Sequence, residues 1–345
     1  MRLESDARDP MGSKPGFRST WSSVGISRVF ERIVGSLRAR DSGARSPRIY
    51  ARIRVEVPAA LRRQSEIQAK ALSMTFSKTH PPKGRVLVVA GSDSGGGAGI
   101  QADIKAVTML GGFAMTAVTA ITVQNTLGVF GVHPIPLEIV TAQIEAVASD
   151  LGVDVVKTGM LGSIEMVETV AAALEKHTKL APLVVDPVMV AKGGHPLLEE
   201  KAVSAIRSLL VPRAFLLTPN APEAARLSDV EVTTLDGQRR AAERLLRLGA
   251  KAVLVKGGHV EGNRFTDLLL TDQGELCFEA ERIETSSTHG TGCTLASAIA
   301  ALLAQGTSLE EAVERARTYV FEAIRRAPGL GAGHGPLDHG WPLRS

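Results

Sequence analysis

The sequence predicts an α/β fold in which a mostly parallel sheet is covered by helices on both faces. From residue 85 onward, short apolar runs alternate with longer segments whose apolar residues recur at helical spacing. The runs are apolar almost throughout, as in parallel strands that are buried on both faces. With 44% hydrophobic and 22% charged residues in a chain of 345, a sizeable core can form. Ligands of such folds bind at the carboxyl ends of the strands, so each end is a candidate site.

The expected elements alternate along the chain. Apolar runs predict strands at residues 86–90, 115–122, 153–157, 183–186, 214–218, 252–256, 265–270 and 276–283. Helical periodicity predicts helices at residues 99–110, 136–149, 163–177, 199–210, 220–227, 236–248, 290–304 and 308–326. Thr307 and Glu310 have the spacing of a capping box at the start of the last helix.

Charge and cysteine content exclude several classes of protein. No apolar run approaches the roughly 18 to 20 residues that cross a bilayer, so a membrane-spanning segment is excluded and we expect no membrane among the partners of the folded domain. Cys277 and Cys293 form neither a disulfide framework nor a metal-ligand spacing, which favours a reducing, cytoplasmic compartment.

Residues 1–73 carry 15 basic and 7 acidic side chains, whereas the remaining residues carry 25 basic and 29 acidic side chains. The basic balance therefore belongs to the leader and does not indicate nucleic-acid binding.

Residues 1–84 form an Arg- and Ser-rich extension for which three interpretations compete. It could be an organellar transit peptide, although three acidic residues among the first nine argue against that. It could be a basic amphipathic segment for a membrane surface or a partner. Alternatively, it is a translated upstream region or disordered tail, and the working protein starts at or near Met74. We favour the third interpretation.

A glycine-rich loop follows the first strand in the stretch "VLVVAGSDSGGGAGIQAD". It lacks the Lys and Ser/Thr that complete a Walker-type phosphate loop, and no register from Gly91 to Gly99 fits the dinucleotide pattern. Two carboxylates, Asp93 and Asp103, flank it instead. Negative charge at its edges favours a neutral, hydrogen-bonding ligand over a polyphosphate.

Polar side chains end several later strands. Asp186 lies in "VVDPVM", Asn220 and Glu223 lie in "LTPNAPEA", and Lys256 lies in "VKGGH". Alone, Asn220 and Glu223 have the spacing of a helix start, Asp186 before proline indicates a turn, and Lys256 indicates a solvated strand end. Together, these groups are the parts of a site for Mg²⁺ and polyphosphate.

The most specific segment is "STHGTGCTLASAIAALLA". Gly290, Thr291 and Gly292 begin a long apolar helix, so free N–H groups and the positive end of the helix dipole converge there. A generic glycine-started helix is the alternative. Thr288 and His289 in front of the glycines, and small residues behind them, make an anion-binding site the better interpretation.

Seven motifs occur in the order and spacing of one known family. They are "AGSDSGGGAGIQAD", "VQNT", "VKTGML", "VDPVM", "LTPNAPEA", "VKGGH" and "THGTGCT". Residues 85–335 therefore resemble the hydroxymethylpyrimidine/phosphomethylpyrimidine kinases of thiamine biosynthesis, in the ribokinase-like superfamily. The resemblance implies a three-layer α/β/α fold, ATP and Mg²⁺ as co-substrates, a small-molecule pyrimidine substrate and a homodimer. Residues 336–345 are set apart as a C-terminal tail.

The resemblance also implies roles for individual residues. Gln124 would bind the pyrimidine edge, because a side-chain amide complements an amino group beside a ring nitrogen. Further substrate contacts would be Gly91, Asp103, Met160 and Val188. The expected catalytic residues are Gly290, Thr291, Gly292 and Cys293. The nucleotide would be bound by Asn220, Lys256 and Thr288. The metal would be held by Asp186 and Glu223.

Cys293 occupies a position where sugar kinases and many pyridoxal kinases of the superfamily carry an aspartate. We interpret the thiol as an adaptation to two successive substrates, since a carboxylate would repel a monophosphate. A pyridoxal or pyridoxine kinase remains the alternative within the same class. A non-catalytic ligand-binding relative is the alternative from another class, and the metal-phosphate residues argue against it.

Overall fold

The computed structural model describes residues 82–344 apart from 192–193, 195–196 and 259–263. The predictions for residues 1–81 lie outside the described residues. The strands are β1 (Arg85–Asp93), β2 (Phe113–Asn125), β3 (Gly128–Pro134), β4 (Val155–Thr158), β5 (Leu183–Val185), β6 (Leu216–Leu217), β7 (Ala252–Val255), β8 (Arg264–Thr271) and β9 (Gly274–Glu281).

Within the described residues these strands form one sheet in the order β3-β2-β1-β4-β5-β6-β7-β8-β9. The central strands from β2 to β7 pair in parallel, whereas β3, β8 and β9 pair antiparallel at the two edges. The carboxyl ends of the parallel strands therefore meet along one rim of the sheet. The predicted α/β class with a mostly parallel sheet is confirmed.

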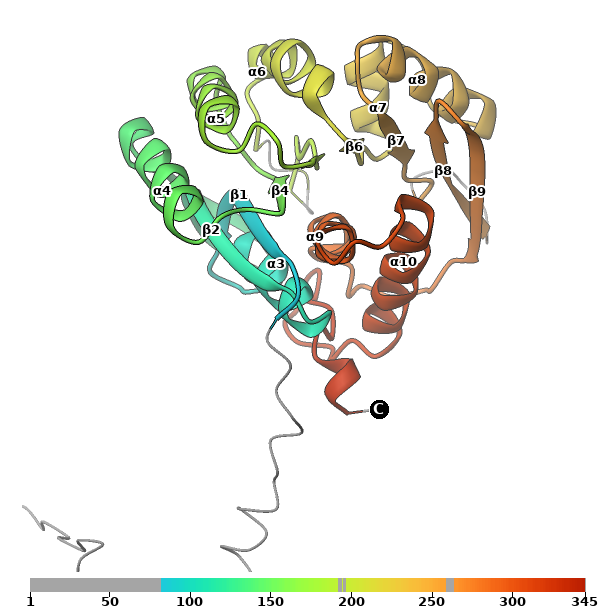
Figure 1. The fold of residues 1–345 in the computed structure, drawn as a ribbon. Coiled ribbons are helices and arrows are strands. Elements are labelled where there is room, and N and C mark those ends of the chain that lie inside the picture. The colour runs from blue at the N-terminus through green and yellow to red at the C-terminus, as the bar shows by residue number, and fades with distance from the viewer. Residues whose placement is uncertain (1–81, 192–193, 195–196, 259–263, 345) are drawn as a thin grey trace, which may run out of the picture. The chain divides into compact units, whose positions relative to one another are not determined.

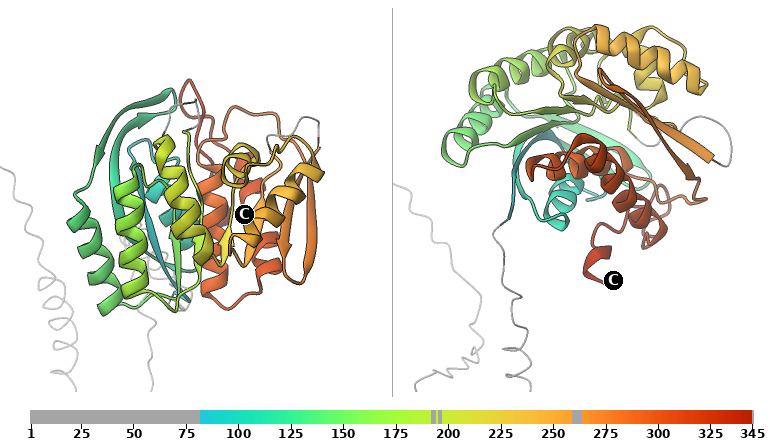
Figure 2. Two further views of the ribbon diagram at one scale, coloured as in Figure 1. Left: turned by 90° about the horizontal axis from the view of Figure 1, so that it is seen from above. Right: turned by 45° about the vertical axis from the view of Figure 1, so that its right-hand side comes forward.

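Helices cover both faces of the sheet (Figures 1 and 2). One face is covered by α3 (Gly99–Met109), α9 (Thr291–Ala304) and α10 (Leu309–Arg325). The other is covered by α4 (Leu137–Asp150), α5 (Ile164–His177), α6 (Glu200–Ala205), α7 (Ala221–Ser228) and α8 (Leu235–Arg247). No helix among the described residues is both long enough and apolar enough to cross a membrane.

Residues 86–90 of β1 are all apolar because this part of the strand is buried on both faces of the sheet. Leu87 and Val89 pack into the core beneath α4 and α5, whereas Val86 and Val88 pack into the core beneath α3 and α9. All four side chains are fully buried. An alternating pattern would leave one of the two cores with polar side chains.

Several boundaries differ from the sequence-based expectation. The β3 strand was not predicted, because its two glycines and terminal proline weaken strand propensity and suit an edge position. The capping pair of Thr307 and Glu310 is wrong by one residue. Ser308 caps α10 by accepting from the Glu311 N–H, while the Thr307 N–H donates to Leu302 at the end of α9. Within 199–210, α6 gives way to a π-helical turn at Ile206–Leu210.

The last described residues pack against α10. Leu337 and His339 are buried. The Tyr319 hydroxyl donates to the His339 carbonyl at 2.8 Å, and the Trp341 indole donates to the Tyr319 carbonyl at 3.1 Å. The His289 N–H donates to the Gly335 carbonyl, so this segment also contacts the residues that precede α9.

Candidate active site

A large cavity of about 1150 Å³ opens at the carboxyl ends of the parallel strands. Its walls come from the ends of β1, β2, β4, β5 and β7 and from the starts of α7 and α9. The predicted site residues that line it are Gly91, Gln124, Met160, Asp186, Val188, Asn220, Glu223, Lys256, Thr288, Gly290, Thr291, Gly292 and Cys293.

Asp103, predicted to lie beside the substrate, does not line this cavity. Its carboxylate is completely buried in α3, where it accepts from Lys157 Nζ at 2.9 Å and from the Ser297 hydroxyl at 2.6 Å. Burial opposes the charge on Lys157, but Asp103 and neighbouring groups hold the pKa of this lysine above its ordinary value. The residue therefore joins α3, β4 and α9 through buried contacts and is not among the residues that line the cavity.

The glycine-rich loop after β1 is organised by Asp93. Its carboxylate accepts the backbone N–H groups of Gly95 at 2.8 Å, Gly97 at 3.0 Å and Ala98 at 2.7 Å. Burial favours the neutral acid, but hydrogen bonds from His289, Ala98 and Gly95 outweigh it and hold the pKa of Asp93 below its ordinary value. The loop's N–H groups thus serve its own carboxylate, which explains why it lacks a phosphate-binding signature.

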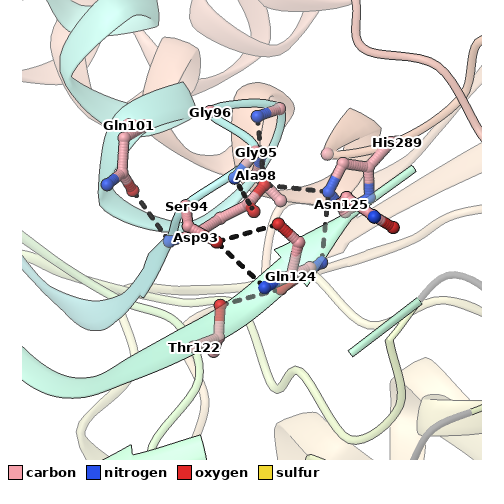
Figure 3. Close-up of polar contacts among 12 residues, drawn as sticks. Asp93, Ser94, Gly95, Gly96, Ala98, Gln101, Thr122, Gln124, Asn125 and His289 are labelled. Carbon is pink, nitrogen blue, oxygen red and sulfur yellow. Dashed lines mark hydrogen bonds and ion pairs between the residues drawn. The ribbon is translucent and has the colours of Figure 1, made fainter. Parts of the chain in front are cut away.

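His289 connects this loop to the candidate substrate contact (Figure 3). Its Nε2 atom lies 2.9 Å from Asp93 Oδ2 and 3.2 Å from Gln124 Nε2. The imidazole also packs closely against Gly97, where any Cβ would lie 2.5 Å from the ring. Gln124 reaches the cavity from the end of β2, and its backbone N–H donates to the Ser94 hydroxyl oxygen at 2.9 Å.

The start of α9 is a close-packed backbone turn. Gly290 has φ of 79°, and a Cβ there would lie 1.8 Å from the Gly97 carbonyl oxygen, so only glycine fits. No side chain caps this helix. Its first N–H groups have no side-chain cap, residues 290–293 line the cavity, and the helix dipole favours an anion there.

Cys293 lies in the first turn of α9 and lines the cavity. Burial raises the pKa of this thiol to about 12, and the carboxylates of Asp103 and Asp186 add to the rise against the opposing effect of Lys157. The side chain is therefore neutral at physiological pH.

An incomplete ion pair lies opposite Gly292. Lys256 Nζ is 3.2 Å from Asp186 Oδ1, and the Thr218 hydroxyl is 3.3 Å from the same oxygen. Within the described part of the chain, Asp186 Oδ2 is buried and has no hydrogen-bond partner. A Cβ on Gly292 would lie 3.2 Å from Lys256 Nζ, so glycine leaves this space open for a ligand.

Glu223 fulfils the helix-cap interpretation and also lines the cavity. Asn220 Oδ1 accepts from the Glu223 N–H at 2.9 Å, and Glu223 Oε2 accepts from the Asn220 N–H at 2.8 Å, which completes a capping box for α7. Burial raises the pKa of Glu223 to about 7, with Asp186 adding to the rise and Lys256 opposing it.

The donor set around Asp186 fits a hard divalent cation. Among the described residues no three His, Cys, Asp or Glu side chains converge as a protein-only metal site. Mg²⁺ is usually bound by one or two carboxylates together with water and phosphate oxygens. The unpaired oxygen of Asp186 and the carboxylate of Glu223 match that requirement.

Sequence reasoning did not find several long-range pairs that organise the site. Asp93 and His289 are 196 positions apart, so no local pattern could pair them. Lys157 ends a predicted strand, and a lysine that ends a buried apolar run was the available indication. The wall formed by Arg317 and Asp267, which pair at 2.8 Å, also comes from distant parts of the chain.

Comparisons with known proteins agree with this geometry. A bifunctional thiamine biosynthesis protein, ThiED, of Geobacter sulfurreducens is 50% identical over 274 residues, covering 79% of this chain and 56% of that protein. A hydroxymethylpyrimidine/phosphomethylpyrimidine kinase of Bacillus subtilis is 48% identical over 256 residues, covering 74% and 94%. The solved structure of an ADP complex of Bacillus subtilis pyridoxal kinase matches with a TM-score of 0.70 at 36% identity, covering 76% and 99%.

The fold and its relatives define the class of protein, which is a kinase with a ribokinase-like α/β/α fold. A family model for phosphomethylpyrimidine kinase matches residues 93–338. The chain belongs to the phosphomethylpyrimidine kinase family.

Proposed function

We propose that this protein transfers the γ-phosphoryl group of ATP to 4-amino-5-hydroxymethyl-2-methylpyrimidine, and then phosphorylates the monophosphate to the diphosphate. The observation that carries the proposal is the position of Cys293, which lines the cavity in the first turn of the uncapped α9, where burial holds the pKa of the thiol above its ordinary value. A neutral group there accepts a hydroxymethyl substrate and an anionic monophosphate alike. The names of relatives that are about 50% identical support the same substrate class.

Each group in the cavity has a place in this reaction. The substrate oxygen attacks the γ-phosphorus, the bond from that phosphorus to the β-phosphate oxygen breaks, and ADP leaves. In the first step the hydroxyl proton passes to an oxygen of the transferred phosphoryl group or to water, whereas the monophosphate oxygen of the second step is already ionised. The N–H groups of 290–293 and the Lys256 ammonium bind and neutralise the phosphoryl oxygens. Bound Mg²⁺ would be held by Asp186 and Glu223 together with phosphate oxygens, and would supply further charge neutralisation.

The pyrimidine is assigned to the opposite end of the cavity. Gln124 would bind the ring edge, Gly91 would allow close approach, and Met160 and Val188 would cover the ring faces. Asn220 and Thr288 are assigned to the nucleotide side. Alignment and charge neutralisation are the main demands of phosphoryl transfer, and this division provides both.

The test is incubation of the purified protein with the hydroxymethylpyrimidine and Mg-ATP, with monophosphate and diphosphate followed separately. We expect the monophosphate to appear first and to be converted to the diphosphate. Absence of both products would contradict the proposal. If only the monophosphate formed, the protein would catalyse the first phosphorylation but not the second.

Pyridoxal kinase activity is a second candidate, because the pyridoxal kinase of Bacillus subtilis shares the fold and 36% identity. Competition between pyridoxal and the hydroxymethylpyrimidine in one assay of ADP production separates the two. We expect the pyrimidine to be preferred, since the Gln124 amide complements an aminopyrimidine edge.

Two further assignments belong to this proposal. The β2–β3 edge exposes a group of apolar side chains, which suits a homodimer interface: Ile121, Val123, Leu127, Phe130 and Val132. Cys277 and Cys293 are free thiols, which suits a reducing, cytoplasmic compartment.

A further inference from the structure

The Gln124 side chain offers a carbonyl oxygen and an amino group that have opposite hydrogen-bonding character. Its Nε2 atom lies 3.2 Å from His289 Nε2, and its Oε1 atom lies 3.1 Å from the Thr122 hydroxyl oxygen (Figure 3). Each of these neighbours makes a second hydrogen bond. Those second hydrogen bonds determine whether each neighbour can donate to the Gln124 amide or accept from it.

His289 must present a donor toward Gln124. Asp93 accepts three backbone N–H groups and lies 2.9 Å from His289 Nε2, and an ionised carboxylate can only accept. The Nε2 atom of His289 therefore carries its one hydrogen and cannot accept, so Asp93 Oδ2 and the Gln124 atom that faces Nε2 must share that hydrogen as acceptors. An amino group of Gln124 facing it would set two donors against each other.

Thr122 leads to the same conclusion from the other end of the amide. Its hydroxyl has one hydrogen, which it donates to the Ser92 carbonyl at 2.9 Å. The hydroxyl oxygen then accepts, and its partner must be the amino group of Gln124. Exchanging the amide oxygen and nitrogen resolves both conflicts at once.

We propose that His289 and Thr122 lock the Gln124 amide with Oε1 toward His289 and Nε2 toward Thr122, and so make the pocket selective for 4-aminopyrimidines over 4-oxopyrimidines. This inference rests on the proposed function, in which Gln124 meets the ring edge. His289 and Thr122 are positioning residues, because they act through Gln124.

The selectivity follows from the order of donors and acceptors. A 4-aminopyrimidine presents an N–H donor and then a ring-nitrogen acceptor, whereas a 4-oxo analogue presents an acceptor and then a ring N–H. A freely rotating amide would turn by 180° and match either edge. A locked amide matches only one, because the hydroxymethyl group must point toward the phosphoryl end and the ring cannot turn over.

The variants Thr122→Val and Thr122→Ser test the lock without touching the phosphoryl end of the cavity. The measured quantity is the ratio of kcat/KM for 4-amino-5-hydroxymethyl-2-methylpyrimidine to that for its 4-oxo analogue. We expect Thr122→Val to lower this ratio by about tenfold through the KM of the amino compound, with an unchanged KM for ATP. Thr122→Ser, which keeps the hydroxyl, should retain the wild-type ratio. A wild-type ratio in Thr122→Val would overturn the proposal.

His289→Leu removes the other end of the lock and should lower the same ratio, whereas a purely structural role would reduce turnover of both compounds equally.

Nuclear magnetic resonance reads the amide orientation without catalysis. In selectively ¹⁵N-labelled full-length protein, we expect the Gln124 amino protons to show contacts to the Thr122 methyl group, and His289 Nε2 to carry a proton. Amino protons that contact the His289 ring would refute the lock even if both phosphorylation steps proceed. A protein that phosphorylates neither compound would instead refute the proposed function.

Discussion

Lys256 and Asp186 form an ion pair that uses only one of the two carboxylate oxygens. Lys256 Nζ lies 3.2 Å from Asp186 Oδ1, whereas Asp186 Oδ2 is buried without a hydrogen-bond partner among the described residues. Burying a charged oxygen without a partner is unfavourable unless a ligand satisfies it. We interpret this oxygen as a position reserved for Mg²⁺, with Glu223 as the second carboxylate.

Replacing Glu223 by Gln should separate the metal role from the helix-cap role. The glutamine carbonyl can still accept from the Asn220 N–H, so the cap remains while the charge is lost. We expect the Mg²⁺ concentration for half-maximal rate to rise by about 10- to 100-fold, with little change in thermal stability. Glu223→Ala is the matched control, and it should raise the Mg²⁺ requirement and also lower the thermal stability. Loss of stability in Glu223→Gln with an unchanged Mg²⁺ requirement would leave the cap as its only role.

The raised pKa of Cys293 predicts a characteristic pH dependence of alkylation. With a pKa of about 12, only about 10⁻⁵ of the thiol is ionised at pH 7, and that fraction rises tenfold with each pH unit. In a Cys277→Ser background, inactivation by iodoacetamide should be slow at pH 7 and should still accelerate tenfold between pH 8 and pH 9. A rate that levels off below pH 9 would mean that the thiol is partly ionised and that the neutral-thiol argument fails.

The exposed apolar edge of β2 and β3 predicts self-association. Val123 in β2 is 63% exposed, and Phe130 in β3 is 67% exposed. The β3 strand forms an edge of the sheet, with β2 as its neighbour. We expect light scattering to give twice the chain mass of 36.4 kDa for the native protein and a monomer for Val123→Glu. Leu180→Glu is the control, because Leu180 is even more exposed, at 97%, but lies in the turn after α5. Monomeric native protein would refute the assignment.

Deletion of residues 1–73 should leave the kinase intact. Each described residue that lines the cavity falls between Ala90 and His334, and the family match begins at residue 93. We expect the truncated protein to keep its turnover of hydroxymethylpyrimidine and its melting temperature within experimental error. A large fall in turnover or solubility would show that the leader belongs to the working protein.

The sequence predicted the site well where its parts are local. Strand ends can be located from apolar runs, and parallel strands bring their ends to one rim, so Asp186, Glu223 and Lys256 could be predicted to converge. The helix start at 290–293 is likewise a local pattern, because glycine spacing and the apolar segment behind it lie within one stretch.

Contacts between distant segments could not be obtained in this way. The Asp93–His289 pair depends on how the β1 loop packs against the start of α9, and neither segment alone specifies it. Asp103 was misplaced because sequence position put it beside the loop, whereas helical geometry turns its side chain inward to Lys157. The β3 strand escaped prediction because edge strands need not be apolar throughout.

The central claim is that a neutral Cys293 lets one cavity carry out two successive phosphorylations. Cys293→Asp puts a carboxylate in its place. That group is a competent acceptor for the proton of a free hydroxymethyl group, and general-base assistance is worth about 10² to 10⁴ in rate. The same charge about 4 Å from a phosphate would cost roughly 4 kcal/mol at an effective dielectric constant near 20.

The decisive measurement is the rate of each step for Cys293→Asp, with both substrates assayed on one enzyme preparation so that any loss of folded protein cancels. The neutral-thiol account predicts that phosphorylation of the hydroxymethyl compound is preserved or faster, while conversion of the monophosphate falls severely and the monophosphate accumulates. An equal fall in both rates would contradict it.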